Sequence, residues 1–407
     1  MNNDIFGRLN ENQIKAVKAT EGRIRVVAGA GSGKTRVLAN RYAYLVDEIG
    51  IDPANIVCLT FTNKAAQEMK TRIRKMVNVG NTNDFICTIH GFCVKILRRD
   101  IYRLGFPSNF MIIDEDDSKR LAKQVFEEFN ISKSESTVQK FLDRVSGFKM
   151  QLDINDGHRI YMDYMLPGCD EEKYKANEMA AYLRLQLKYF AVDFQDIIYF
   201  ALHLLENFPD VLEYWQNEIN YLQVDEVQDC SMTDWKLLEL LCGKYQNLFV
   251  VGDPDQAIYE WRGAKPDAFV NFRADETIIL NRNYRSTSNI LDVANSIIRN
   301  NENRVKKNLY TQKQDSCITI HHHAKSEKAE GEWIANQIAK TIEKGGKASD
   351  FAILYRASYQ SRFVEQALMQ KSINYVIWGG IRFFERLEIK HRYLVSILFK
   401  NIRLPNL

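Results

Sequence analysis

A glycine-rich segment, VVAGAGSGKTR at Val26–Arg36, carries residue types that bind phosphate. The apolar run Ile24–Val27 predicts a buried strand, and the apolar spacing after Lys34 predicts a helix. Glycines between them let backbone N–H groups approach phosphate oxygens, and a helix N-terminus adds partial positive charge. Lys34 is expected to reach the β- and γ-phosphates, and the Thr35 hydroxyl to bind Mg²⁺. The expected phosphate-binding residues are Ala28, Gly29, Ala30, Gly31, Ser32, Gly33, Lys34 and Thr35. An empty glycine turn is the disfavoured alternative, because the motif has both its strand and its helix.

Two acidic residues follow a second apolar strand, Tyr221–Val224. Beside a phosphate loop, Asp225 can hold Mg²⁺ through water, and Glu226 can orient and deprotonate an attacking water. A further strand, Leu248–Val251, leads to Gln256, which can contact the γ-phosphate or that water. These residues predict hydrolysis of a nucleoside triphosphate.

Aromatic and cationic residues come just after Gln256, at Tyr259, Trp261 and Arg262. Such groups form stacking platforms for single-stranded nucleic acid, although a buried aromatic corner is the structural alternative. Phe61 lies near the end of the predicted strand 56–62 and Asn63 follows it, while His90 follows the strand 85–89. Polar and aromatic strand ends in a row can carry an extended nucleic-acid strand.

Two further segments suit the nucleotide itself. Gln13 can pair with the donor and acceptor edge of adenine, and Tyr284 can stack on the base. Arg285 can reach the γ-phosphate from a second domain across a cleft.

The elements that must position these residues predict an α/β fold. Strands and helices alternate up to His90, whereas residues 91–192 are mostly helical apart from short stretches such as 110–113. The sheet resumes with Tyr221–Val224, so the helical segment is expected to be an insertion. A second α/β unit is expected from a helix at 330–343 and strands at 317–321, 351–355 and 375–378, with Arg356 ending the middle strand. We interpret His321, His322 and His323 as structural.

Composition describes an ordinary cytoplasmic protein. Of the 407 residues, 45% are apolar and 26% charged, and we find no apolar run of membrane-spanning length. The seven scattered cysteines predict reduced thiols rather than disulfides or a zinc site. Net charge is +8 over 1–110, −13 over 111–240 and +8 over 241–407. The two basic segments suit a bound polyanion, with solvated surface charge as the alternative.

Ten motifs in order resemble those of the UvrD/Rep/PcrA family of superfamily 1 DNA helicases. They are LNENQ, AGAGSGKTR, LTFTNKAAQEM, TIHGFC, DFQDII, VDEVQD, VGDPDQAIYEWRGA, LNRNYRSTSNIL, AILYRASYQSR and GGIRFFERLEIK. The resemblance implies an α/β fold: a RecA-like P-loop NTPase motor domain with a helical insertion, plus an incomplete second RecA-like domain. The implied ranges are 1–90 with 193–280 for the first motor domain and 91–192 for its insertion. The partial second motor domain would be 281–378, followed by the start of a second insertion at 379–407.

The resemblance also implies ATP and Mg²⁺ as cofactors and assigns roles. Gln13, Arg36 and Tyr284 would hold adenine, Lys34 and Arg285 the phosphates, and Thr35 with Asp225 the metal. Glu226 would be the catalytic base and Gln256 the coupling residue. The residues implied to line a single-stranded DNA track are Phe61, Asn63, His90, Tyr259, Trp261, Arg262 and Arg356. Ser358 stands where the family usually has Asn, so we carry over no contact there.

The implied activity is 3′→5′ translocation on single-stranded DNA and unwinding at junctions with duplex, with repair or replication proteins as partners and no membrane. The family's TxHxxKGLEF-type motif and its final arginine motif are not found after GGIRFFERLEIK. We therefore expect an N-terminal portion of a helicase with weak activity. The alternative is a module that binds ATP and DNA but needs a missing half or a partner to turn over.

Overall fold

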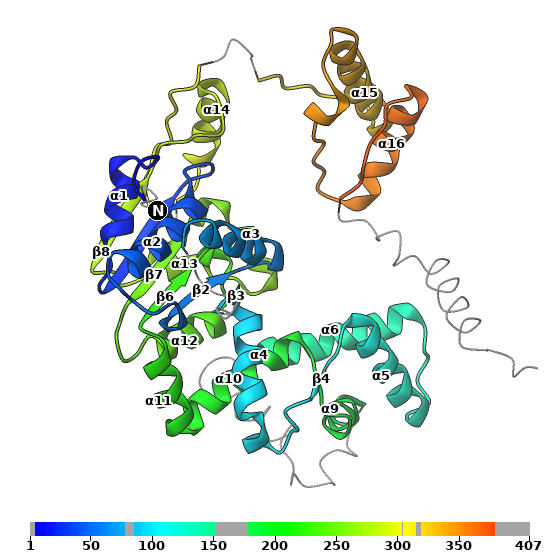
Figure 1. Ribbon diagram of the computed structural model, residues 1–407. Coiled ribbons are helices and arrows are strands. Elements are labelled where there is room, and N and C mark those ends of the chain that lie inside the picture. The colour runs from blue at the N-terminus through cyan, green and yellow to red at the C-terminus, as the bar shows by residue number, and fades with distance from the viewer. Residues whose placement is uncertain (1–4, 78–84, 152–177, 303, 315–318, 379–407) are drawn as a thin grey trace, which may run out of the picture. The chain divides into compact units, whose positions relative to one another are not determined.

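The computed structural model describes residues 5–77, 85–151, 178–302, 304–314 and 319–378 (Figure 1). The chain divides into two compact units, Met1–Thr319 and Ile320–Leu407. This division places residues 281–319 with the first unit, whereas the limits expected from the sequence stay predictions. Within the described ranges, no helix is long and apolar enough to cross a membrane.

A six-stranded sheet forms the centre of the first unit, in the order β3-β2-β6-β7-β1-β8. Its paired strands are parallel throughout. The strands are β1 (Arg23–Ala28), β2 (Ile56–Thr60), β3 (Ile86–Thr88), β6 (Tyr221–Val224), β7 (Leu248–Gly252) and β8 (Glu276–Leu280). Parallel strands end at one edge of the sheet, so the loops after β1, β2, β3, β6 and β7 meet there.

Helices cover both faces of this sheet, because successive strand residues point to opposite sides. Along β2, Ile56 and Cys58 join one apolar core, whereas Val57 and Leu59 join the other. The first core is completed by α1 (Glu11–Lys18), α2 (Lys34–Asp47) and α3 (Asn63–Arg74). The second is completed by α4 (Ile89–Asp100), α10 (Phe194–Asn207), α11 (Pro209–Glu218), α12 (Met232–Leu241) and α13 (Pro266–Val270).

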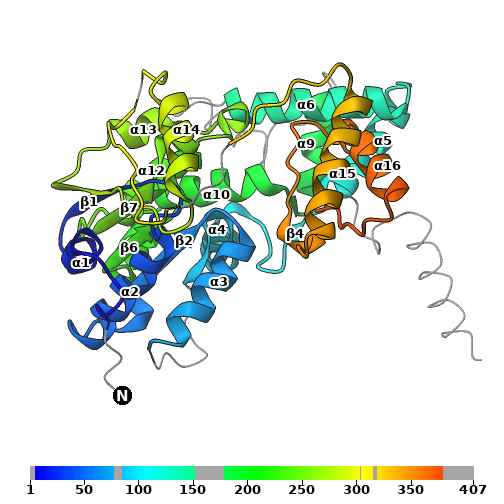
Figure 2. The same cartoon turned by 90° about the horizontal axis from the view of Figure 1, so that it is seen from above.

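Between α4 and α10 the described chain forms helices and one short sheet. The helices are α5 (Glu115–Glu128), α6 (Glu135–Gln151) and α9 (Glu178–Lys188), which lie together in both views (Figures 1 and 2). The strands β4 (Met111–Ile112) and β5 (Ala191–Val192) pair in parallel. Lys149 of α6 is buried and donates to Asp193 and Asp196 at the start of α10, which joins the two helices.

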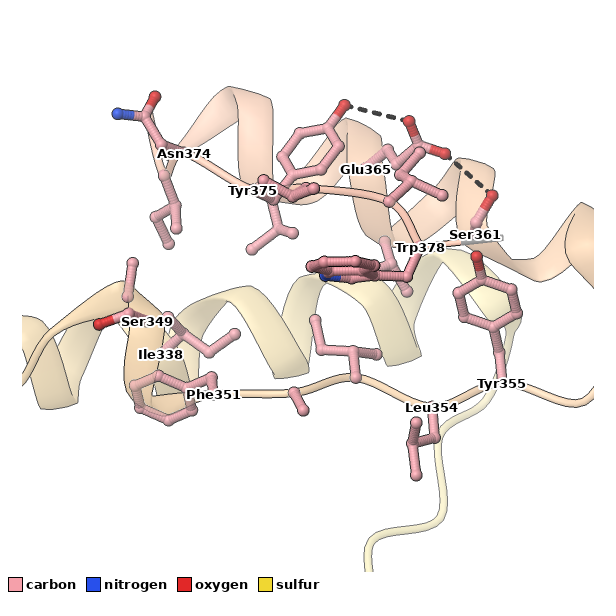
Figure 3. A pocket seen from close by; sticks show the side chains of 18 residues that line it. Ile338, Ser349, Phe351, Leu354, Tyr355, Ser361, Glu365, Asn374, Tyr375 and Trp378 are labelled. Carbon is pink, nitrogen blue, oxygen red and sulfur yellow. Dashed lines mark hydrogen bonds between the residues drawn. The ribbon is translucent and has the colours of Figure 1, made fainter. Parts of the chain in front are cut away.

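The second unit is helical in its described part, so the strands predicted there are wrong. Helices α15 (Glu327–Glu343) and α16 (Ser361–Gln370) pack around a small core of Ala335, Ile338, Ala367 and Leu368. Segments 319–321, 351–355 and 375–378 are not strands, and 317–318 lie outside the described residues. His322 stacks on Trp333 with ring centroids 4.3 Å apart. Segments 351–355 and 374–378 instead line an apolar groove of about 730 Å³ (Figure 3). Apolar composition favoured extended chain, but a strand also needs ladder hydrogen bonds from a neighbour.

Candidate nucleotide and nucleic-acid site

The phosphate loop joins β1 directly to α2. Ala28 is the last residue of β1 and its side chain is buried in the sheet core. Gly31 and Gly33 have φ of +66° and +90°, a backbone region that other residues rarely adopt. Lys34 begins α2, so the free N–H groups of the first helical turn belong to this loop. Local sequence therefore forms the strand, turn and helix that the glycine spacing predicts, and binding of an anion there stays a prediction.

Lys34 and Glu226 form an ion pair, with Lys34 Nζ 2.7 Å from Glu226 Oε2. Glu226 is the second residue after β6 and has a left-handed backbone, with φ of 53°. Such a conformation is uncommon for a residue other than glycine and often accompanies a functional site. Gln228 Nε2 also donates to Glu226 Oε2, at 2.9 Å. The structure thus brings together the predicted phosphate lysine and the predicted base.

Asp225 lies beside this pair and is buried. Burial, followed by the neighbouring Glu226 charge, raises the pKa of Asp225 to about 7. The described residues contain no cluster of three or more His, Cys, Asp or Glu that could hold a metal ion. Asp225 and Thr35 offer oxygen atoms, which Mg²⁺ prefers, and this ion usually takes its remaining ligands from water and nucleotide phosphates. The donor set fits Mg²⁺ bound together with a nucleotide.

The residues expected around adenine lie near one another. Gln13 is buried and donates through Nε2 to the Ser32 carbonyl at 2.8 Å, while its Oε1 accepts from the backbone of Asn10. Asn10 also donates to the Tyr284 hydroxyl at 2.7 Å. The Arg36 guanidinium lies 5.9 Å from the Tyr284 ring centroid. Gln13 here supports the phosphate loop, a role that sequence reasoning missed.

Asn283 is a second residue that sequence reasoning missed. Its buried side chain donates to the Ala30 carbonyl at 2.7 Å and accepts from the backbone N–H groups of Arg285 and Ser286. It therefore fixes the chain that carries Arg285 against the phosphate loop. The Arg285 side chain is exposed and is therefore accessible to an anionic ligand. The available signal in the motif NRNYRS was the residue type, since an Asn amide can donate and accept at the same time.

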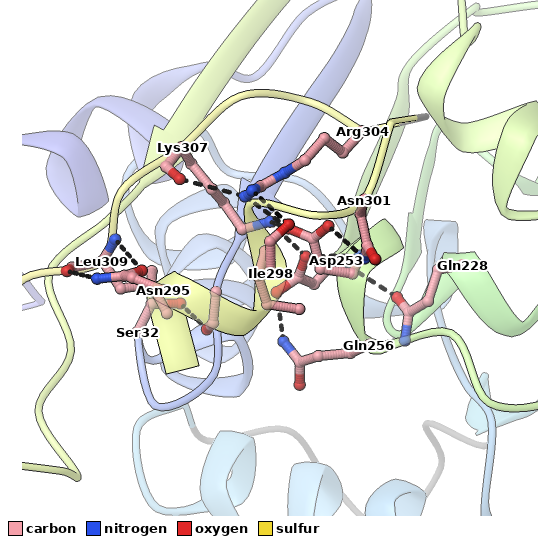
Figure 4. A network of polar contacts seen from close by, with 12 residues as sticks. Ser32, Gln228, Asp253, Gln256, Asn295, Ile298, Asn301, Arg304, Lys307 and Leu309 are labelled. Atoms are coloured by element: carbon pink, nitrogen blue, oxygen red, sulfur yellow. Dashed lines mark hydrogen bonds and ion pairs between the residues drawn. The ribbon is translucent and has the colours of Figure 1, made fainter. Parts of the chain in front are cut away.

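Gln256 lies in a polar network after β7 (Figure 4). Its Nε2 donates to Asp253 Oδ2 at 2.5 Å, and the backbone N–H of Asp253 donates to Gln228 Oε1 at 3.0 Å. Lys307 ion-pairs with Asp253 at 2.5 Å, a contact between residues far apart in sequence. Asp253 and Lys307 were not among the predicted site residues.

The aromatic residues expected to bind nucleic acid form a connected group. The ring centroids of Phe61 and Tyr259 are 4.9 Å apart, and those of Tyr259 and Trp261 are 6.4 Å apart. Arg262 lies 5.4 Å from the Trp261 ring centroid. Trp261 is 72% exposed, so the alternative that this aromatic side chain is buried in the core is wrong.

The other residues predicted to contact DNA are not part of this aromatic group. His90 lies at the start of α4 beside Phe194, and burial lowers the pKa of His90. Asn63 is exposed at the start of α3. Arg356 is exposed and belongs to the second unit. Their contacts with nucleic acid stay predictions.

Two family models match this chain. Residues 9–277 match the UvrD/REP helicase N-terminal domain, and residues 278–399 match the UvrD-like helicase C-terminal domain. The ATP-dependent DNA helicase PcrA of Staphylococcus aureus strain Mu50 is 40% identical over 393 residues, which are 95% of this chain and 53% of that protein. The protein of the same name from Staphylococcus epidermidis gives the same identity and coverage.

The chain spans about half the length of the curated relatives it matches. Because the matches cover both family domains, the expectation that the chain lacks the C-terminal helicase motifs is not confirmed. The mixed α/β fold with its parallel sheet agrees with the matched family. The N-terminal match alone extends over more than half of the sequence, and we conclude that this chain belongs to the UvrD/REP helicase family.

Proposed function

We propose that this chain hydrolyses ATP with Mg²⁺ and uses the energy to move 3′→5′ along single-stranded DNA and separate strands at junctions, in repair or replication. The observation that carries this proposal is the Lys34–Glu226 pair beside a glycine-rich loop at the carboxyl edge of the sheet. The names of the relatives support ATP dependence and action on DNA. Direction and pathway rest on the resemblance alone.

Nucleotide binding would begin with competition for Lys34. The triphosphate carries more negative charge than Glu226, so the ammonium is expected to turn from the carboxylate to the β- and γ-phosphates. Backbone N–H groups after Gly29 would bind the same phosphates. Thr35 and Asp225 would hold Mg²⁺, which would neutralise phosphate charge.

Hydrolysis would then use the freed carboxylate. Glu226, no longer paired with Lys34, can accept a proton from a water aligned with the γ-phosphate. Gln256 would contact that phosphate, and the exposed Arg285 would bring positive charge to it. Gln256 and Trp261 are in one loop, which supports coupling of the nucleotide state to the DNA-stacking group.

Turnover and strand separation test this proposal directly. Steady-state ATPase rates of the chain should rise when an unlabelled oligo-dT is added. A duplex with a 3′ single-stranded tail should be unwound, and one with a 5′ tail should not. Nucleotide and DNA binding without turnover would support the alternative binding module. Equal unwinding from both tails would contradict the proposed direction.

A further inference from the structure

Lys307 lies at the centre of a buried ion cluster between two loops. Its Nζ is 2.5 Å from Asp253 Oδ1 and 2.6 Å from Asp255 Oδ2, and its side chain is 3% exposed (Figure 4). Arg304 contributes a second cation, 2.9 Å from Asp255 Oδ2. Asn301 adds a weaker donor to Asp255 at 3.4 Å. Two cations thus balance two carboxylates, which makes burial of the four groups tolerable.

One carboxylate of this cluster also holds Gln256. Asp253 receives Lys307 on Oδ1 and the Gln256 amide on Oδ2, at 2.5 Å each. The backbone of Asp253 donates to Gln228, whose own amide donates to Glu226. A continuous series of hydrogen bonds therefore joins Lys307 to both the proposed coupling residue and the proposed base.

The chain around Lys307 also contacts the phosphate loop. We call residues 304–310 the strap. Leu309 of the strap lies so close to Gly29 that a Cβ built there would be 2.2 Å from Leu309 Cδ2. Asn295 of α14 (Ser288–Ile298) fixes Leu309 by donating to its carbonyl at 2.9 Å and accepting from its N–H at 3.4 Å. The strap is thereby anchored near the phosphates.

We propose that Lys307 is a positioning residue for the ATPase reaction, which holds Asp253 so that the Gln256 amide is placed for the γ-phosphate. This inference rests on the proposed function. Without the ammonium, Asp255 would keep its ion pair with Arg304, but Asp253 would be a buried carboxylate that has lost its cation, and the loop that carries Gln256 would move to relieve this cost. Within the described residues, the ion pairs of Lys307 are with Asp253 and Asp255 and not with the phosphate loop, so its loss should affect turnover more than nucleotide binding.

The test compares K307M with K307R and with K306M. Lys306 is the exposed neighbour, and within the described residues it makes no ion pair. K307M should lower the DNA-stimulated kcat by about 10- to 100-fold while KM for ATP changes less than about 3-fold. K307R should recover most of the rate, and K306M should match the unchanged chain. Unchanged kcat in K307M would overturn the inference.

A double substitution shows whether Lys307 acts through Gln256. If it does, K307M/Q256A should be no slower than Q256A alone, because the positioned amide is already gone. If the rate losses of K307M and Q256A instead multiply in the double variant, Lys307 does not act through Gln256. Melting temperatures identify variants that fold poorly, and Lys307→Gln, whose amide can still donate to Asp253, takes the place of K307M if that variant unfolds.

Binding of γ-phosphate mimics gives a readout that needs no turnover. K307M should weaken binding of ADP with aluminium fluoride about 10-fold or more relative to ADP alone, since this mimic resembles the phosphoryl group in the transition state and not ground-state ATP. The role of Lys307 would be contradicted if the ratio of the two dissociation constants, for ADP with the mimic and for ADP alone, were the same in K307M and in the unchanged chain. If the unchanged chain binds both nucleotides without hydrolysing ATP, the proposed function fails, and this ratio still decides the inference.

Discussion

Lys34 Nζ lies 2.7 Å from Glu226 Oε2, so the cation expected to bind phosphate is paired with the carboxylate expected to act as the base. Each group is therefore held in place by the other. If Lys34 binds the phosphates as proposed, it must leave Glu226, and this same step would free the carboxylate for proton transfer. The contact makes the two residues interdependent in a way that the sequence motifs alone do not state.

Glu226→Gln should separate binding from hydrolysis. The amide keeps the shape of the side chain but cannot act as a base, so turnover should fall by about two to four orders of magnitude. Because the amide attracts Lys34 less than a carboxylate does, ATP should bind at least as tightly as before. Fluorescent-analogue titration and steady-state ATPase assays measure the two effects. Near-normal turnover would remove Glu226 from its role.

Lys34→Ala should abolish nucleotide binding or turnover. The substitution removes the ammonium at the start of α2 and leaves the Glu226 charge facing the phosphates. The same titration provides the measurement, with Lys306→Ala as an exposed control. An analogue that binds the Lys34 variant as tightly as the unchanged chain would show that the phosphate-loop assignment is wrong.

Gly29→Ala should weaken nucleotide binding because of the strap. A methyl group at Gly29 would clash with Leu309, with 2.2 Å to its nearest carbon, so either the loop or the strap must shift. Adding Leu309→Ala should make room and restore much of the binding. Gly147→Ala is the control, because a Cβ there meets no atom within 4 Å. Without such recovery, the contact would not explain the loss.

Trp261→Ala should weaken binding of single-stranded DNA by about 1–3 kcal/mol with little dependence on base sequence. Loss of a stacking face removes no phosphate contact, so the slope of log Kd against log salt should stay the same. Arg262→Ala and Arg356→Ala should reduce that slope if each residue binds phosphate. DNA titrations at several salt concentrations distinguish these cases. Unchanged affinity in the Trp261 variant would exclude it from the DNA site.

The first unit could be predicted closely because its strands are short apolar runs ended by turns. Predicted strand 221–224 matches β6, and 248–251 differs from β7 by one residue. The segments 351–355 and 375–378 have the same apolar character but find no ladder partner within the described residues, which a single run of sequence cannot reveal. Composition indicates an extended chain, whereas pairing depends on residues elsewhere.

Some residues of the candidate site could be predicted from local sequence, and others could not. Lys34 and Glu226 belong to motifs whose chemistry is visible in a few adjacent residues. Lys307 meets Asp253 across 54 positions, and Asn283 meets Ala30 across 253. Nothing local distinguishes Lys307 from its neighbour Lys306, so only the fold reveals its role.

The last prediction concerns Lys149, whose fully buried ammonium lies 2.5 Å from Asp193 and 2.7 Å from Asp196. Lys149→Met would take the cation away from the buried Asp196 and the partly buried Asp193 and should cost about 3–5 kcal/mol. Urea unfolding followed by circular dichroism measures this loss, with Lys140→Met at an exposed position of α6 as the control. Equal stability of both variants would show that the cluster is not essential to the helical segment.

The ion pair between Lys149 and Asp193 should make the stability of the folded chain depend on pH. Burial alone would raise the pKa of Asp193, but the Lys149 ammonium lowers it below its ordinary value. A carboxyl with a lowered pKa in the folded chain stabilises fully above its unfolded pKa of about 4, and that contribution is lost as pH falls through the folded value. In Lys149→Met the same carboxyls are buried without a cation and should protonate more readily. The difference in urea midpoint between the unchanged chain and Lys149→Met should therefore be large at pH 7 and shrink below about pH 4. A difference that stays constant over this range would mean that the ion pair contributes through packing and not through charge.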